Sequence, residues 1–416
     1  MVLNIVWIGF VLIGLLVAVW RLANGETDIF TKVLTGLFDT ARTGVDISLG
    51  LIGVMSLWLG LMKIGEQAGV IQLFARAFAP FFRQLFPAIP PGHPAGGSIV
   101  MNFSANMLGL DNAATPLGLK AMRELQEINP RKDVASDPMI MFLVLNTAGI
   151  TLIPTSVIAI RQTLAIEQGL VGFNAADIFL PTLIGTFISF TAGLVAVAMV
   201  QRIRLWSAPV LAFFGGFAAL MGGLYLGLSQ LPPERIGPTI GVIGAGVILA
   251  VIFLFVAAGA WRRINVYEAF VDGAKDGFGV AVQIIPYLVA ILVAISVFRT
   301  TGCMDALVGL IAAAVAALGL NTDFVPALPV GLMKTLSGSG ARGLMVDVMK
   351  THGVDSFPGQ LAAIIQGSTE TTFYVLAVYF GSVNIRKTRY ALTCGLIADA
   401  VGLVGAILVG YAFFAR

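Results

Sequence analysis

The residues best placed to do chemistry in this sequence are polar side chains that interrupt long apolar runs. The sharpest case is Glu370, which lies inside the apolar run 359–381. A carboxylate within a bilayer costs several kcal/mol unless it is paired or protonated. We therefore expect Glu370 to bind a coupling cation, carry a proton or hold a ligand hydroxyl; alternatively, it is a dipole-compatible acid in the first turn after a break at Gly367. Its polar neighbours are expected to bind substrate: Gln366, Ser368, Thr369 and Thr371.

A second acidic residue, Asp399, lies in the middle of the apolar run 391–414. It is a second candidate for a proton or ion site, and the alternative is pairing with an arginine at a helix end. The coupling ion, H⁺ or Na⁺, is left open. No cofactor or metal is expected, because the two cysteines and the two histidines are scattered and form no ligand motif.

In the first half, residues 102–116 combine amides, hydroxyls and an acid at a point where apolar sequence is interrupted. Thr115 followed by Pro116 predicts a helix start, with a hydroxyl cap and proline in the first turn. We expect these polar groups to contact a ligand at the end of a half-helix, or else to satisfy freed backbone groups. The candidate residues are Asn102, Ser104, Asn106, Asn112 and Thr115, joined further along by Asn146 and Thr147.

The second half has a different polar motif, the Gly/Ser-rich segment 337–343. Such a loop at the start of a helix presents backbone N–H groups to an anion or a polar oxygen. Ser337, Ser339 and Arg342 are its candidate binding residues, although a flexible surface turn would look the same.

The elements that must position these residues are membrane helices. Hydrophobic residues make up 58% of the chain and charged residues 11%, whereas soluble domains carry about 25% charged residues. Lipid is therefore the expected solvent, and the net charge of +3 does not suggest a nucleic-acid partner. Spanning-length apolar runs lie at about 3–20, 45–62, 139–160, 177–200, 208–230, 238–260, 279–298, 359–381 and 391–414.

Two further regions, 69–110 and 302–336, each contain two short apolar pieces interrupted by Pro, Gly and Asn. Pieces this short indicate half-helices or re-entrant hairpins. A weak repeat relates the halves, since residues 39–44 match 272–277 and Gly69 falls on Gly302 at the same offset. The number of crossings before the second copy is odd, so we predict an all-α integral membrane protein with two inverted-topology repeats and broken helical hairpins.

The predicted organisation has four parts: an N-terminal membrane helix at 1–27, retained rather than cleaved, a first repeat at 28–200, two linking helices at 201–261 and a second repeat at 262–416. Most basic loop residues fall on one side in this count, which predicts that side to be cytoplasmic. Arg21, Lys32 and Arg42 fall on the other side and argue against it.

The polar motifs also carry a resemblance to known families. The first half, through Asn106–Met122, resembles the spore maturation protein A family. The second half, through 337–343, 366–374 and 387–392, resembles the spore maturation protein B family. The chain is thus similar to a fusion of the two, both members of the nucleoside-recognition, or Gate, family, which includes concentrative nucleoside transporters. The resemblance implies a transporter-like fold and, in spore formers, a role in spore maturation; it implies no particular substrate.

The function expected from these observations is a transporter or permease for a small polar, nucleoside-like solute in the bacterial inner membrane. The alternative is a non-transporting membrane scaffold that assists peptidoglycan or spore-cortex maturation. An enzyme is disfavoured, because the sequence shows no catalytic constellation or phosphate-binding loop. The expected partners are the solute and the lipid bilayer, and a homo-oligomer is an open alternative.

Overall fold

A computed structural model describes residues 2–108, 111–152, 154–230 and 233–414, and these residues form helices joined by short loops, with no β-strand among them. The first half contains α1 (Val2–Ala23), α2 (Ile29–Gln67), α3 (Val70–Leu85), α4 (Pro94–Met107), α5 (Asp111–Glu127), α6 (Asp137–Thr147), α7 (Thr155–Glu167), η1 (Ala175–Ile178) and α8 (Phe179–Gln201). Two linking helices follow, α9 (Ala208–Ser229) and α10 (Pro233–Trp261). The second half contains α11 (Val266–Thr300), α12 (Cys303–Ala317), η2 (Val325–Ala327), α13 (Leu328–Leu336), α14 (Gly338–His352), α15 (Phe357–Ser368), α16 (Thr372–Ser382) and α17 (Ala391–Phe414).

The helices have the length and surface of a multi-pass membrane protein. Within the described residues, six helices are long and apolar enough to cross a bilayer, and a seventh candidate, 288–317, is bent by 74° at its break. Large apolar side chains point outward along several of them, among them Leu16, Phe38, Phe253, Leu310 and Leu408. Such a surface needs lipid rather than water around it.

The two halves have the same order of elements. Helices α2 to α8 correspond one by one to α11 to α17, with α9 and α10 between the two sets. In both halves a very long helix is followed by three shorter helices, and these are followed by a helix broken near its middle. The break lies at 148–154 between α6 and α7, and at 369–371 between α15 and α16.

Two local expectations were wrong. The run 139–160 is not one span, because α6 ends at Thr147 and α7 starts only at Thr155, after Pro154, which has no N–H to continue a helix. The helix start expected at Thr115 lies earlier, since α5 already begins at Asp111 and Pro116 lies inside it. Pro116 is the sixth residue of α5, beyond the first four N–H groups that lack partners within a helix, so it removes one backbone hydrogen bond from α5.

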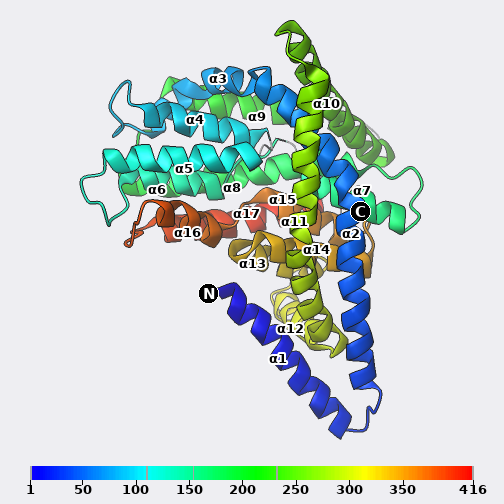
Figure 1. Cartoon of the computed structure of the whole chain (residues 1–416). Helices are drawn as coiled ribbons and strands as arrows, with labels where there is room; N and C mark the ends of the chain where they lie inside the picture. Colours follow the sequence, from blue (N-terminus) through cyan, green and yellow to red (C-terminus); the bar gives the residue numbers. More distant parts are fainter. Residues whose placement is uncertain (1, 109–110, 153, 231–232, 415–416) are drawn as a thin grey trace.

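Corresponding helices pack antiparallel. Along α2 and α11, Gly44 faces Val289 whereas Gly60, further along α2, faces Phe270, earlier in α11. Figure 1 shows these two long helices running in opposite directions across the shorter ones. The α8–α17 pair is antiparallel too, since Gly193 faces Ala398 and Ser189 faces Gly402. Antiparallel pairing is what an inverted repeat requires; the placement of each half in a membrane stays a prediction.

The crossing of α2 and α11 depends on glycine, and this can be tested on a single helix. A Cβ at Gly273 would lie 2.2 Å from the carbonyl oxygen of Leu59, whereas one at Gly279 would meet nothing within 4 Å. We expect Gly273→Ala to destabilise the protein by about 1–3 kcal/mol through overpacking against backbone. Gly279→Ala, on the same helix, is the matched control. Thermal unfolding in detergent would contradict this packing if both variants melted like the parent.

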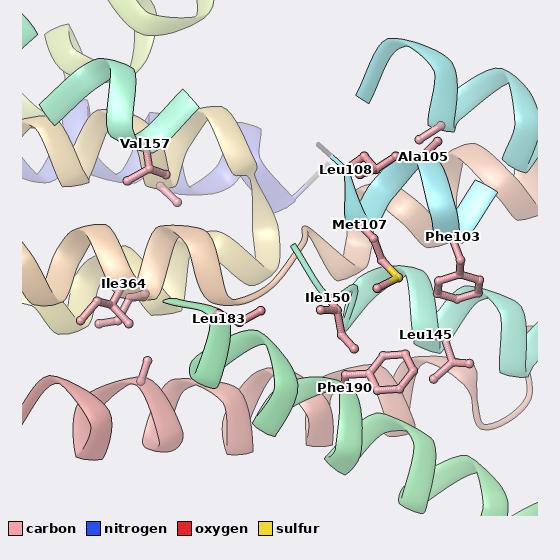
Figure 2. Close-up of a cluster of buried hydrophobic side chains, with 14 of the residues drawn as sticks. Phe103, Ala105, Met107, Leu108, Leu145, Ile150, Val157, Leu183, Phe190 and Ile364 are labelled. Atoms are coloured by element: carbon pink, nitrogen blue, oxygen red, sulfur yellow. The ribbon is translucent and has the colours of Figure 1, made fainter. Parts of the chain in front are cut away.

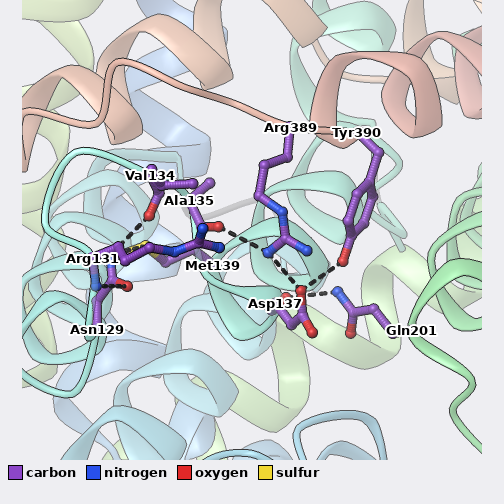
Figure 3. A network of polar contacts seen from close by, with 9 residues as sticks. All are labelled: Asn129, Arg131, Val134, Ala135, Asp137, Met139, Gln201, Arg389 and Tyr390. Atoms are coloured by element: carbon purple, nitrogen blue, oxygen red, sulfur yellow. Dashed lines mark hydrogen bonds and ion pairs between the residues drawn. The ribbon is translucent and has the colours of Figure 1, made fainter.

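Three loops with basic residues meet around Asp137 at the start of α6 (Figure 3). Its carboxylate accepts from Arg389 Nη1 at 2.7 Å and from Tyr390 Oη at 2.9 Å, and its carbonyl accepts from Gln201 Nε2 at 2.8 Å. Burial and the bond to Asp137 together raise the pKa of Tyr390 to about 12, so the phenol stays a neutral donor. The loops after α5, α8 and α16 therefore lie together at one end of the molecule.

Candidate functional site

The two mid-helix breaks, one from each half, meet directly. The Glu370 backbone N–H in the second break donates to the Thr147 carbonyl at the end of α6, at 2.8 Å. The first break is also tied to α4, because the Leu152 N–H donates to the Met107 carbonyl at 2.9 Å. Broken helices persist at membrane depth only where protein or a wet cavity satisfies the freed backbone groups. Here each break supplies part of what the other one lacks.

Apolar packing holds the first break in place. Figure 2 shows the side chain of Ile150, inside the break, between Met107 of α4 and Phe190 of α8. The ring of Phe103, one turn earlier on α4, stacks on Phe82 with centroids 4.6 Å apart. The break is therefore a defined, buried turn that joins α4, α6 and α8.

A polar cavity of about 610 Å³ lies where the breaks meet. Its size falls in the range of small-molecule sites, about 300–1,000 Å³. Its wall is made of helix ends: α7, α14 and α16 begin there, and α4, α6, α13 and α15 end there. The polar and charged residues that line it are Asn106, Asn146, Thr151, Thr155, Ser156, Lys334, Ser337, Ser339, Arg342, Gln366, Glu370, Thr371 and Tyr374.

The charge of the cavity is uneven. Two cationic side chains, Lys334 and Arg342, and one anionic side chain, Glu370, line it, so the formal balance is two minus one, or +1. Lys334 is 5% exposed, and its Nζ lies 4.0 Å from Glu370 Oε2, whereas the Glu370 side chain is 53% exposed. The carboxylate therefore faces the open cavity, with the ammonium group behind it. The N-termini of three helices add partial positive charge, and the C-termini of four helices add partial negative charge.

The start of α14 is held by its own serines. Ser337 Oγ accepts from the Gly340 N–H at 3.1 Å and lies 3.2 Å from Ser339 Oγ. Gln366 crosses from α15 and donates through Nε2 to the Gly338 carbonyl at 3.5 Å. The other amide atom of Gln366, Oε1, is buried and has no hydrogen-bond partner within the described residues. Native structures rarely leave a buried acceptor in this state.

The structure brings half of the sequence-predicted site residues to this cavity. Asn106 and Asn146 come from the first half, and the Asn106 amide donates to Asn146 Oδ1 at 2.9 Å. The second half contributes Ser337, Ser339, Arg342, Gln366, Glu370 and Thr371.

Other predicted site residues form hydrogen bonds with backbone carbonyl groups instead. The Asn102 amide donates to the Ala114 carbonyl at 2.7 Å and so ties α4 to the start of α5. The hydroxyls of Ser104, Thr147 and Ser368 each donate to a carbonyl in the preceding turn of their own helix. Thr115 is half-buried within α5 and does not line the cavity.

Three predicted residues stand apart from both groups. Thr369 and Asp399 line a separate, much smaller hollow on the far side of the second break. Asn112 belongs to α5, but its side chain lies outside the described part of the structure.

Sequence reasoning did not select five of the residues that line the cavity: Thr155, Ser156, Tyr374, Thr151 and Lys334. A signal existed for the first two, because Pro154 directly before two hydroxyl residues is typical of a helix start. Reading 139–160 as one continuous span hid that signal.

A larger hollow of about 1,040 Å³ lies between α3 and α4. It contains none of the predicted residues and takes its whole lining from the first half, including Arg76, Arg83 and His93. The polar cavity between the breaks, built by both halves, is therefore the candidate site.

Comparison with known proteins gives three matches. The profile of the Gate family, described as nucleoside recognition, matches residues 48–164 and 281–386, which contain both breaks. Spore maturation protein A of Bacillus subtilis is 44% identical over 186 residues, 45% of this chain and 89% of that protein. Spore maturation protein B of the same organism is 44% identical over 163 residues, 39% of this chain and 88% of that protein, in a different part of the chain. No solved structure matches.

Proposed function

The chain belongs to the Gate family, described as nucleoside recognition, and from this premise we propose that it is a permease for a small polar, nucleoside-like solute. The observation that carries the proposal is the polar cavity between the two mid-helix breaks. Transporters built from repeats bind their substrates at the repeat interface, on discontinuous helices whose ends face the ligand. This cavity has that construction, with contributions from both halves.

The lining favours a neutral, hydroxylated solute with an amide-like edge. Glu370 presents a carboxylate that accepts from a hydroxyl, and Gln366 Oε1 is an acceptor without a partner in the described structure. Asn106 and Asn146 supply amides on the opposite wall. A nucleoside combines sugar hydroxyls with a flat base that has donors and acceptors, so it matches these groups in kind. The proposal extends to the class of solute and not to one compound.

The setting is proposed from the relatives. Both curated relatives are named spore maturation proteins, and we place the permease in the inner membrane of a bacterium, serving envelope or spore maturation. Movement of the solute is coupled, in this proposal, to H⁺ or Na⁺.

The test is solute binding and uptake by the purified, full-length protein. Nucleosides, sugars and amino acids are screened by thermal shift in detergent, and hits are then followed as labelled solutes entering liposomes that contain the protein. We expect Gln366→Ala to weaken binding of the hit about 2- to 10-fold, the value of one neutral hydrogen bond.

Gln360→Ala is the matched control, since Gln360 lies on the same helix and does not line the cavity. If neither substitution changes the affinity for the solute, the solute does not bind in this cavity. A protein that binds and moves none of these solutes would favour the scaffold alternative.

A further inference from the structure

Asp399, on α17, has a half-satisfied carboxylate on the opposite side of the second break from the solute cavity. The residue is only 7% exposed. Its Oδ2 accepts from Thr372 Oγ1 at 2.7 Å, where α16 begins. Its Oδ1 is buried and makes no hydrogen bond of normal geometry within the described residues, although the Thr335 hydroxyl lies close enough to interact with the carboxylate. Burying an ionised oxygen without a partner costs several kcal/mol, so native structures rarely leave one in this state.

A small hollow adjoins this carboxylate. Its volume is about 10 Å³, close to the space of a single water-sized particle. Thr335, Ser368 and Thr369 contribute to its wall, and Gly331 of α13 and Gly402 of α17 also line it. The hollow and the solute cavity share no lining residue.

Few ionisable residues lie on the helices that pack around Asp399. Helices α8 and α15, which pack on α17, carry no ionisable residue. The positive charge of Lys334 on α13 acts on the Asp399 carboxylate. Its Nζ also lies 4.0 Å from Glu370 Oε2. Of the other ionisable residues on α6 and α16, Asp137 binds Arg389, and the remaining two are Tyr374 and Tyr379.

We propose that Asp399 and its hollow form an occluded site for one monovalent cation, a proton or a Na⁺ ion. A proton on Oδ1 would remove the charge, and a Na⁺ ion in the hollow would balance it with Asp399, Thr335 and Thr369 as oxygen ligands. The site is joined to both ends of the second break, because Thr369 precedes Glu370 and Thr372 follows it. The binding of a cation at Asp399 therefore sets the position of the Glu370 side chain in the solute cavity. The proposed cation site does not depend on the proposed permease function. Only its effect on solute binding through Glu370 depends on that function.

The test needs no solute. The thermal unfolding midpoint of the full-length protein in detergent is measured in NaCl, KCl and choline chloride at equal ionic strength. Infrared spectroscopy of the same samples records the stretching band of protonated carboxyl groups at neutral pH, with isotope-labelled aspartate to assign the band. We expect either a stabilising shift specific to Na⁺ or a protonated aspartate band, and the loss of that signal in Asp399→Asn.

Asp276→Asn, an exposed acid on α11, is the matched control and keeps the parent's signal. If Asp399→Asn does not fold, the two readouts on the labelled parent protein test the proposal. Thr335→Val is then expected to diminish any Na⁺-specific shift of the unfolding midpoint. The absence of both a Na⁺-specific shift and a protonated aspartate band in the parent overturns the proposal. These readouts do not involve solute. A protein that gives the expected cation signal but transports no solute would therefore contradict the permease proposal and support the cation site.

Discussion

Glu370→Gln is expected to weaken solute binding by about 10- to 150-fold, the value of about 1.5–3 kcal/mol for a hydrogen bond to a charged group. The carboxylate faces the cavity, so its loss removes an acceptor for a solute hydroxyl. The substitution also takes the negative charge away from Lys334, which lies 5% exposed beside it.

A double-mutant cycle separates these two contributions. Lys334→Met alone is also expected to impair the site, because it leaves Glu370 without the charge behind it. If the two groups act as a pair, the double variant loses less binding free energy than the sum of the losses in the two single variants. Equilibrium binding of the solute found in the screen is the measurement, and Glu127→Gln, an exposed acid at the end of α5, is the control. Unchanged affinity in Glu370→Gln would show that this carboxylate does not touch the solute.

Asp177→Ala is expected to lower the free energy of unfolding by about 3–5 kcal/mol, the cost of leaving a buried charge without its partner. The partner is Arg161 on α7, which is fully buried. Its guanidinium group is paired with the Asp177 carboxylate, donates to the Ala175 carbonyl at 2.8 Å and lies 4.9 Å from the ring centroid of Phe173. Because the start of α7 lines the solute cavity, we expect the loss to loosen that wall as well.

The double variant Arg161→Met with Asp177→Ala tests the cause. Replacing both charges by apolar groups removes the unpaired cation, so stability is expected to return most of the way to the parent value. Denaturant unfolding in detergent micelles is the measurement, and Asp276→Ala, at an exposed position, is the control. A single Asp177→Ala variant as stable as the parent would mean that Arg161 has another counter-charge.

The sequence alone determined the membrane class, the regions of broken helix at 69–110 and 302–336, and the matching order of the two halves. These properties are local: the length of an apolar run and the interruption of a run by Pro, Gly or Asn can be read without knowing what packs on it. The polar motifs around Asn106, Ser337 and Glu370 were identifiable for the same reason, because each is unusual in its own apolar surroundings.

Tertiary structure alone decided which polar groups face a shared cavity. Asn102 and Asn106 lie one turn apart on α4, yet Asn102 binds the backbone of α5 while Asn106 reaches Asn146 in the cavity wall. Likewise, only the packing puts Glu370 and Asp399 on opposite sides of one break. Pro154 is a local signal of the break at 148–154, but the group that satisfies the Thr147 carbonyl before it is the Glu370 N–H, far along the chain. Whether a polar group in a membrane protein meets backbone, solute or ion depends on its neighbours in space, and local sequence does not contain them.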